Sequence, residues 1–442
     1  MKDEQSLLHW LLTVCLVVAI VTSGGIAFAG TNGDELRVNG MRLNTSMEKM
    51  KDFGKSSSGG STRVAYSEEN RQAYGYLAEL MSDAGLTVRI DAAGNLIGHR
   101  KGKRPALPPI VSGSHIDTVP DGGHYDGIVG VMAAIEVART LHDAGHLTDH
   151  PLEIIVWSNE EGGKTGSRSI NGSVAEKEFE LPSLGDKSIG EGMRFLGGDP
   201  DHLPEIVRER GNIAGYVELH IEQGAILDRD NISIGVVDGI VGIKRWNITV
   251  HGFANHAGTT PMDQRRDALL AAAQFITEVR RIITAEPGRQ VGTVGRIQAY
   301  PGAPNVIPGK VTLSLEIRDL DMQKIDLLFG RMNEAANVLA DETGTKFDFT
   351  QFYVSPAAIT DDRISQLIGT AARNLELSAI HLPSGAGHDA QSIAPIGPIG
   401  MIFVPSLNGV SHSPKEFTSA QQITDGANVL LQTVIGLDQL LQ

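Results

Sequence analysis

The sequence has a single cysteine among its 442 residues, and this residue, Cys15, lies in an N-terminal stretch that carries no Asp, Glu, Lys or Arg. If that stretch is removed, the remaining chain has no thiol. Disulfide bonds and thiolate metal ligands are then both excluded. Any metal ion would have to be held by histidine and carboxylate side chains.

The sequence also lacks any run of Lys or Arg long enough to follow a phosphate backbone. Its formal net charge is -15 and its pI is about 5.4, so we expect no nucleic acid as a partner. Hydrophobic residues make up 41% of the chain and charged residues 21%, which is typical of a soluble globular protein. The length exceeds that of one ordinary core and indicates two domains.

The uncharged N-terminal stretch, residues 5–32, predicts export. Its apolar part runs from Leu11 to Val21, and Ala27-Phe28-Ala29 supplies the small-x-small pattern that a signal peptidase requires. We therefore expect a signal peptide, cleaved after Ala29, and a periplasmic or secreted protein. The alternative is an uncleaved membrane anchor, because the stretch is long enough to span a bilayer.

Strands and helices alternate through the first half of the chain, which predicts an α/β domain with a mostly parallel sheet. Periodicity predicts amphipathic helices, and it predicts strands whose residues are mainly apolar. The expected helices are Glu68 to Ala84 and Ile128 to Leu141, and the expected strands are Leu86 to Ile90, Leu96 to His99, Ile110 to His115 and Leu152 to Ser158.

The pattern changes near Asp238 and indicates an inserted α+β module of ~110 residues. Its expected strands are Lys244 to His251, Gly292 to Ala299 and Val311 to Arg318, and its expected helices are Arg266 to Ala285 and Met322 to Asp341. The α/β pattern resumes near Ile364. We therefore predict a signal peptide (1–29), a discontinuous catalytic domain (30–237 and 353–442) and an inserted lid or dimerisation domain (238–352).

A histidine and two aspartates mark the end of the strand Ile110 to His115. His115 closes the strand, at the edge of the sheet where α/β proteins place their binding groups. Asp117 can turn back towards the imidazole and fix its tautomer, as carboxylates do beside metal-bound histidines. Asp126 is next to Gly127, before the helix that follows. A buried core histidine and a helix N-cap are the alternative explanations for His115 and Asp126.

The same arrangement recurs at three other places, which favours a metal site over those alternatives. Glu160 and Glu161 are adjacent carboxylates at the end of the next apolar strand, where they need a cation or a shared proton. Alternation along a third strand places Glu218, His220 and Glu222 on one face. His412 lies in a Gly/Ser loop after a fourth apolar strand. Nitrogen and oxygen ligands of this kind suit zinc or manganese.

Four motifs in order resemble those of M20-type metallohydrolases, within their hydantoinase/carbamoylase branch. They are HIEQG from His220, ANHAGTTPMDQR from Ala254, PNVIPG from Pro304 and GAGHDA from Gly385. The resemblance covers nearly everything after Ala65. That branch contains N-carbamoyl-L-amino-acid hydrolases, β-ureidopropionase of the yeast type, allantoate amidohydrolases and ureidoglycolate amidohydrolases.

The resemblance implies two divalent ions per subunit, bridged by Asp126. One would be held by His115, Asp126 and His220, and the other by Asp126, Glu161 and His412. Zinc is the first expectation for the metal, with manganese, cobalt or nickel as alternatives. Glu160 would be the general base and His256 would stabilise the oxyanion.

The resemblance also implies substrate contacts from Gln223, Asn305, Arg318 and His388, with Arg318 binding a carboxylate. An ion pair with Asp319 or Asp321 is the alternative role for Arg318. The sequence departs from the branch after Glu160-Glu161-Gly162. Many members have an Arg-Phe pair there, whereas this chain reads Gly163-Lys164-Thr165-Gly166-Ser167-Arg168. This difference bears on the substrate rather than on the reaction.

The expected reaction is hydrolysis of a C–N bond in a small ureido or carbamoyl carboxylate. An N-carbamoyl-L-amino acid, which would give the amino acid, carbon dioxide and ammonia, is the first candidate. Allantoate or ureidoglycolate comes next, followed by an aminoacylase or dipeptidase substrate. A non-catalytic binding protein would have lost ligands, yet all five ligands and Glu160 are present. The resemblance also implies a homodimer formed through the inserted domain.

N-terminal sequencing of the mature protein tests the export prediction. We expect the chain to begin near Gly30, because cleavage would follow Ala29. An intact Met1 in a membrane fraction would support the anchor instead.

Overall fold

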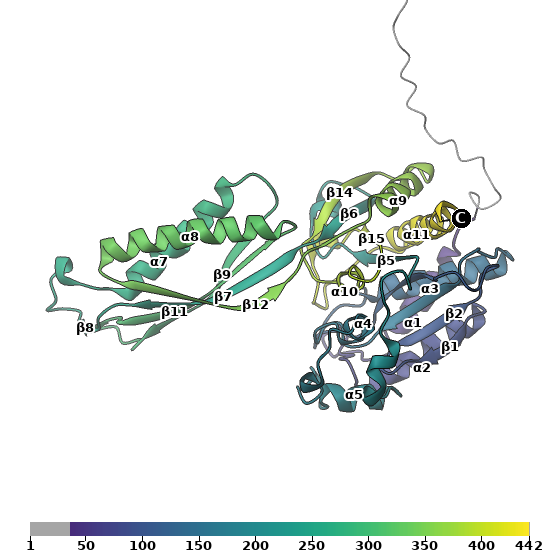
Figure 1. Cartoon of the computed structure of the whole chain (residues 1–442), viewed down its shortest axis with the longest axis horizontal. Coiled ribbons are helices and arrows are strands. Elements are labelled where there is room, and N and C mark those ends of the chain that lie inside the picture. Colours follow the sequence, from purple (N-terminus) through teal and green to yellow (C-terminus); the bar gives the residue numbers. More distant parts are fainter. Residues whose placement is uncertain (1–35, 442) are drawn as a thin grey trace, which may run out of the picture. The chain divides into compact units, whose positions relative to one another are not determined.

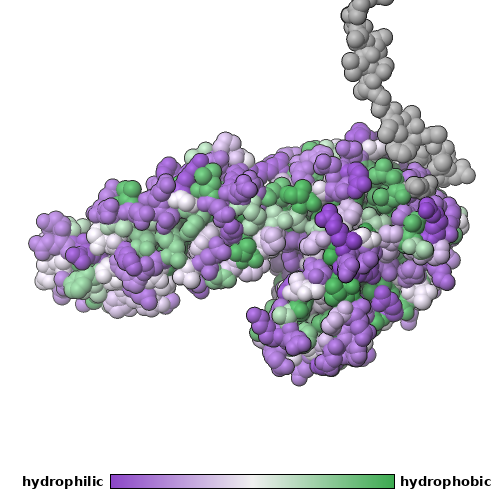
Figure 2. Space-filling model, in the orientation of Figure 1, coloured by the Kyte–Doolittle hydropathy of each residue, from purple (hydrophilic) through white to green (hydrophobic). Residues whose placement is uncertain are grey.

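The computed structural model describes residues 36–441, and the fold below refers to them (Figure 1). The expected signal peptide and Cys15 lie outside this range. Within it, no helix is both long and apolar enough to cross a membrane. The face of the molecule shown in Figure 2 is mostly hydrophilic, with hydrophobic side chains scattered over it.

The larger sheet has nine strands, and its centre is parallel. Its order is β1 (Thr87–Ile90), β2 (Leu96–Arg100), β4 (Leu152–Trp157), β3 (Ile110–His115), β5 (Gly215–Ile221), β15 (Ile399–Val404), β6 (Ile234–Ile240) and β13 (Ala358–Ile359), with β14 (Ala379–Ser384) also paired to β6. Strands β4, β3, β5 and β15 run parallel to one another. The antiparallel pairs, such as β1 with β2 and β13 with β6, flank them. The carboxyl ends of the four central strands therefore meet at one edge of the sheet.

Helices cover both faces of this sheet, and alternate residues of its strands pack against them. On one face lie α1 (Gly40–Met50), α2 (Glu68–Asp83), α3 (Ile128–Asp143), α9 (Asp362–Asn374) and α11 (Ala420–Leu440). On the other lie α4 (Thr165–Ile170), α6 (Ile226–Arg229) and α10 (Asp389–Ile393). In β4, Ile154 and Val156 join the first core, whereas Ile155 and Trp157 join the second. This period of two is what a strand buried on both sides requires. A short helix, α5 (Ile189–Phe195), packs in a small separate cluster.

A separate antiparallel sheet is inserted between β6 and β13. Its order is β12 (Lys346–Ser355), β7 (Gly242–His251), β11 (Lys310–Asp319) and β9 (Val291–Tyr300), and a two-stranded ribbon joins β8 (Asn255–His256) to β10 (Val306–Ile307). Helices α7 (Ala268–Ala285) and α8 (Met322–Thr343) cover one face of this sheet (Figure 1). Its core includes Phe275 and a stacked pair, Trp246 and Phe329, whose ring centroids are 4.2 Å apart. Each sheet therefore has a core of its own.

The predicted fold class is confirmed: an α/β sheet with a parallel centre and a separate antiparallel sheet with two helices. The expected strands and helices named above all form. Helix α1, strand β6 and helix α11 were not predicted, although Ser419 and Gln422 form a capping box at the start of α11. The four-stranded sheet uses residues 242–355, while the domain boundaries at 238 and 352 stay predictions.

Close packing of α3 on the sheet predicts a large cost for one added methyl group. A Cβ on Gly130 would lie 2.2 Å from the carbonyl oxygen of Leu219. We expect Gly130→Ala to lower the free energy of unfolding by about 1–3 kcal/mol, since the helix would have to move away from the sheet. Thermal or urea unfolding measures this. Gly75→Ala is the matched control, because a Cβ in that helix meets nothing within 4 Å. It should be stabilising by about 0.5–1 kcal/mol, and equal effects of the two substitutions would contradict the packing described.

Candidate metal centre

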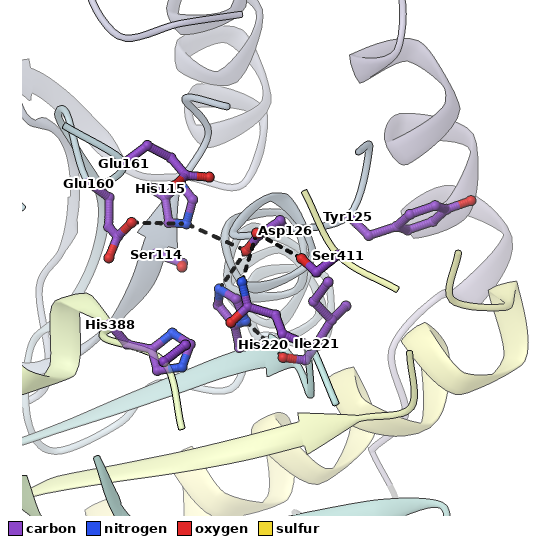
Figure 3. Close-up of polar contacts among 12 residues, drawn as sticks. Ser114, His115, Tyr125, Asp126, Glu160, Glu161, His220, Ile221, His388 and Ser411 are labelled. Atoms are coloured by element: carbon purple, nitrogen blue, oxygen red, sulfur yellow. Dashed lines mark hydrogen bonds and ion pairs between the residues drawn. The ribbon is translucent and has the colours of Figure 1, made fainter. Parts of the chain in front are cut away.

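Two neighbouring parallel strands bring His115 and His220 together at the carboxyl edge of the larger sheet (Figure 3). Asp126 faces both from the loop before α3. The residue that follows it, Gly127, has φ +69, and a Cβ there would lie 2.5 Å from the imidazole of His115. Only glycine combines this backbone conformation with this close approach.

The carboxylate of Asp126 lies between the histidines. Its Oδ1 is 3.2 Å from His220 Nε2 and 3.9 Å from His115 Nε2, and its Oδ2 is 3.0 Å from His412 Nε2. His412 Nε2 is in turn 3.3 Å from Glu161 Oε1. The five predicted ligands therefore form two groups that share Asp126, each with its ligand atoms within 4.8 Å of one another. Either group could hold a metal ion.

The hydrogen bonds of two histidines leave lone pairs that point into this centre. His115 Nδ1 donates to the carbonyl of Asp117 at 3.0 Å, and His220 Nδ1 donates to the carbonyl of Ile221 at 2.9 Å. A carbonyl only accepts, so in the neutral ring each Nε2 carries the lone pair. His220 Nε2 is buried and makes no hydrogen bond within the described chain. A buried lone pair facing the Asp126 carboxylate is unfavourable unless a proton or a cation lies between them, so these residues fit a metal ion.

Burial and charge shift the pKa values of the centre in opposite directions. Burial favours the neutral form of Asp126, but the neighbouring imidazoles of His220 and His412 outweigh it and hold its pKa well below the usual range. Burial raises the pKa of Glu161 to about 8. The hydrogen bond to Asp126 raises the pKa of His412 to about 9, against the effect of its burial. Near neutral pH, Glu161 and His412 therefore each retain a proton that a bound cation would replace.

Glu160 lies beside the two groups without belonging to either. Its Oε2 is 3.8 Å from His115 Nε2, and burial raises its pKa above that of an ordinary glutamate. The carboxylate of Asp117 holds this turn in place by accepting from the backbone N–H groups of Glu160 (3.3 Å) and Glu161 (3.1 Å). The backbone carbonyl of Asp117 thus fixes the tautomer of His115. The carboxylate of Asp117, whose Oδ1 is 3.8 Å from His115 Nδ1, instead positions Glu160 and Glu161.

Glu416, which was not among the predicted site residues, links two loops of the centre. Its Oε1 accepts from the backbone N–H groups of Tyr125 (2.9 Å) and Asp126 (3.1 Å), and its Oε2 accepts from Ser411 Oγ at 2.9 Å. Asp126 and the loop that carries His412 are therefore held by one buried carboxylate. The feature of the sequence that comes nearest to indicating this role is the position of Glu416, four residues after the predicted ligand His412.

Gln223 and His388, two predicted substrate contacts, lie against the centre. Gln223 Nε2 donates to Asp126 Oδ2 at 2.8 Å. The imidazole of His388 packs edge-on against that of His220, with centroids 4.4 Å apart, and its Nε2 is 2.7 Å from Ser384 Oγ. His388 also forms a third candidate group with Glu218 and His220. Glu218, however, already accepts from Ser114 Oγ, Tyr216 Oη and the backbone N–H of Ala390, so it buttresses the strand beneath the centre.

The expectation that Glu222 continues the face of Glu218 and His220 was wrong, because Glu222 lies beyond the end of the strand. Strand β5 ends at Ile221, and the carboxylate of Glu222 accepts from the N–H groups of Ile226 and Leu227 at 2.9 and 2.8 Å. It therefore caps the short helix α6. Beyond the end of a strand nothing maintains the alternation of side chains, and a carboxylate there can turn to accept from the free backbone N–H groups at the start of a helix.

Three other predicted residues come from the inserted sheet and its ribbon. Arg318 Nε donates to Glu316 at 2.7 Å, and its Nη1 donates to the carbonyl of Gly385 at 2.7 Å. The suggested partners Asp319 and Asp321 were therefore wrong. Glu316 lies on the same face of β11 as Arg318, because side chains two residues apart in a strand point the same way.

His256 and Asn305 lie together on the ribbon of β8 and β10. His256 is exposed, and its Nδ1 accepts from the N–H groups of Gly258 and Thr259, while the carbonyl of Asn305 accepts from Ala257 N–H. Among residues 36–441, no hydrogen bond or ion pair joins these two side chains to the metal centre.

Lys164, in the segment where the sequence departs from the branch, connects two parts of the chain. Its Nζ donates to Gln391 Oε1 at 2.5 Å, and Gln391 Nε2 donates to the carbonyl of Pro356 at 2.7 Å. Pro356 follows β12, where the chain leaves the inserted sheet. Hydrogen bonds thereby connect the turn that carries Glu160 to the segment through which the chain leaves the inserted sheet.

The chain is similar to known proteins over most of its length. Residues 111–435 match the family model described as peptidase family M20/M25/M40. An N-carbamoyl-L-amino acid amidohydrolase of Geobacillus stearothermophilus is 39% identical over 91% of this chain and 99% of its own. A ureidoglycolate hydrolase of Arabidopsis thaliana is 35% identical over 91% of this chain and 87% of its own. A crystal structure of a putative amidohydrolase/peptidase from Burkholderia cenocepacia matches with a TM-score of 0.84 and 36% identity, over 91% and 99% of the two chains.

The shifted pKa values predict that metal affinity depends on pH. Since Glu161 and His412 must lose protons before they can bind a cation, we expect the affinity of metal-free protein for Mn²⁺ to rise between about pH 6 and 8. Calorimetric titration in buffers of different ionisation enthalpy measures both the affinity and the protons released. Glu161→Gln should weaken binding and flatten the dependence. An affinity that is constant over this range would contradict the assignment.

Proposed function

Because the chain belongs to peptidase family M20/M25/M40, within its hydantoinase/carbamoylase branch, we propose that it hydrolyses N-carbamoyl-L-amino acids. Members of that branch are amidohydrolases that act on C–N bonds other than peptide bonds. The products would be an L-amino acid, carbon dioxide and ammonia. The observation that carries the proposal is the pair of ligand groups sharing Asp126, with Glu160 beside them and outside both.

Glu160 is suited to move the proton in this reaction. Burial raises its pKa, so its carboxylate is a stronger base than an exposed glutamate and its acid form persists nearer to neutral pH. It takes a proton from the attacking water as the oxygen bonds to the carbamoyl carbon. It then gives that proton to the amino nitrogen as the C–N bond breaks. The carbamic acid that is left decomposes to carbon dioxide and ammonia.

The metal ions would contribute positive charge at the reacting carbonyl and water. Bound divalent cations lower the pKa of water and polarise a carbonyl. We propose zinc, with manganese, cobalt or nickel as alternatives, because imidazole and carboxylate ligands suit all four. The ligands would be His115, Asp126 and His220 for one ion and Asp126, Glu161 and His412 for the other.

Substrate contacts are proposed for residues around the adjoining cavity. Gln223 and Arg318 line the same cavity of about 740 Å³. Within residues 36–441 the Nη2 group of Arg318 makes no hydrogen bond, so it remains able to bind the substrate carboxylate. Gln223 and His388, which contact Asp126 and His220, would face the ureido group.

We propose further that the protein is a homodimer formed through the inserted domain. Strand β9 is an edge strand, and its Ile297 and Tyr300 are 47% and 39% exposed. An apolar edge with unpaired backbone groups favours pairing with a second chain. His256 and Asn305 would then complete the centre of the neighbouring subunit, with His256 stabilising the oxyanion. Light scattering should give twice the mass of one chain, and Ile297→Asp should give a monomer. A monomeric wild type would rule this out.

A related substrate is the second candidate for the reaction. The similarity to the Arabidopsis ureidoglycolate hydrolase, at 35% identity, favours a ureido carboxylate other than a carbamoyl amino acid. Allantoate belongs to the same class, and aminoacylase or dipeptidase substrates come after it. All of these share a carboxylate for Arg318 and a carbonyl for the metal centre. They differ in the group that occupies the rest of the cavity.

An activity screen with Glu160→Gln tests the proposal. Metal-loaded wild type should release ammonia from N-carbamoyl-L-amino acids, with allantoate, ureidoglycolate and dipeptides as competitors in the screen. Glu160→Gln should lower kcat at least ~100-fold, because the amide cannot take the proton. Its metal content should be unchanged, since Glu160 is in neither ligand group. Glu69→Gln, on the exposed side of α2, is the matched control. Full activity of Glu160→Gln would refute the mechanism.

A further inference from the structure

The cavity beside the metal centre has an uneven distribution of charge. Three arginines and two carboxylates line it: Arg229, Arg289, Arg318, Glu222 and Asp230. The lining is thus positive by one charge although the whole chain carries -15. A cleft of that sign, in an acidic protein, favours an anionic ligand.

All but one of these charged side chains already have partners. Arg229 donates to the carboxylate of Asp230 at 2.7 and 2.8 Å. Glu222 caps α6, and Arg318 is bound to Glu316 and to the carbonyl of Gly385. Arg289 is exposed and makes no hydrogen bond or ion pair within residues 36–441. Besides the Nη2 group of Arg318, Arg289 is therefore the charged group of this cavity that is left for a ligand.

The backbone that carries Arg289 is held firmly. Its neighbour Gln290 is buried, with Nε2 donating to the carbonyl of Ile283 at 2.9 Å. Lys324 Nζ donates to Gln290 Oε1 at 2.6 Å and to the carbonyl of Pro287 at 3.0 Å. The segment around Arg289 is thus already held by hydrogen bonds, which limits the entropic cost of binding a ligand.

Strand register places the first residue of β9, two positions after Arg289, beside Arg318. Val291 pairs directly with Arg318 across β9 and β11, and Arg289 precedes Val291 by two residues. All three residues line the cavity. Both arginines thus line one cavity from neighbouring segments of the chain, where one anionic ligand has access to both.

We propose that Arg289 binds a second carboxylate on the substrate, so that the preferred substrates are N-carbamoyl derivatives of acidic amino acids. The inference rests on the proposed function and specifies its substrate class. Arg318 binds the α-carboxylate, and Arg289 binds the side-chain carboxylate. Guanidinium has donors and no acceptor, so it favours a carboxylate over a neutral amide or ureido group of similar size. The apolar lining residues Val241, Val291 and Leu382 pack against the intervening methylene groups.

Two substrates of nearly equal shape and different charge test this directly. The quantity is the ratio of kcat/KM for N-carbamoyl-L-aspartate to that for N-carbamoyl-L-asparagine, measured with the metal-loaded full-length enzyme. Wild type should favour the aspartate derivative. Arg289→Gln should lower the ratio about tenfold or more, as expected for the loss of one charge-assisted hydrogen bond of about 1.4 kcal/mol. Arg289→Lys should retain most of the preference, because it keeps the charge.

Arg229→Gln is the matched control, since this arginine also lines the cavity but is bound to Asp230. It should leave the ratio unchanged. A wild type that favours the asparagine derivative, or a ratio that Arg289→Gln leaves unaltered, would overturn this inference alone. An equal loss on both substrates would do the same, because it would assign Arg289 to the shared carboxylate. Turnover of neither substrate, with turnover of ureidoglycolate or allantoate, would overturn the proposed function and this inference with it.

Discussion

The buried carboxylate of Asp126, set among three imidazoles, is the interaction on which the rest of the structure depends. Its oxygens lie 3.0 to 3.9 Å from nitrogens of His115, His220 and His412. A buried carboxylate is costly unless positive charge surrounds it. The histidines can supply that charge by holding protons or by sharing a cation, and the orphaned Nε2 of His220 favours the cation.

The fold meets this constraint by bringing distant segments to one edge of a sheet. Residues 115 and 220 end neighbouring parallel strands, while residue 412 lies in a loop fixed by Glu416. Glu416 also accepts from the backbone N–H of Asp126, so one side chain holds both this aspartate and the loop that carries His412. Glycine at position 127 lets the backbone pass beside the imidazole of His115. Neighbouring strands and one buried carboxylate thus bring together predicted ligands from distant parts of the sequence, His115 to His412.

Much of this could be predicted, because strand ends and their polar residues are local features of the sequence. Each of the five predicted ligands follows an apolar strand or precedes a helix, and the structure brings all five together: His115, Asp126, Glu161, His220 and His412. What the sequence could not provide was the choice of partner made by long side chains. Glu222 caps a helix, Arg318 pairs with Glu316, and Glu416 reaches back across the chain to residue 126. Such partners depend on which distant segments come together in the folded chain, and the periodicity of a single segment does not indicate this.

A metal-loaded crystal structure with anomalous scattering measured at the absorption edge of the metal tests the central claim most directly. The account predicts two peaks, one beside each oxygen of Asp126: the first between His115 and His220, the second between Glu161 and His412. Glu160 should approach the centre without contacting either peak. A single peak, a peak among Glu218, His220 and His388, or none at full metal loading would contradict it.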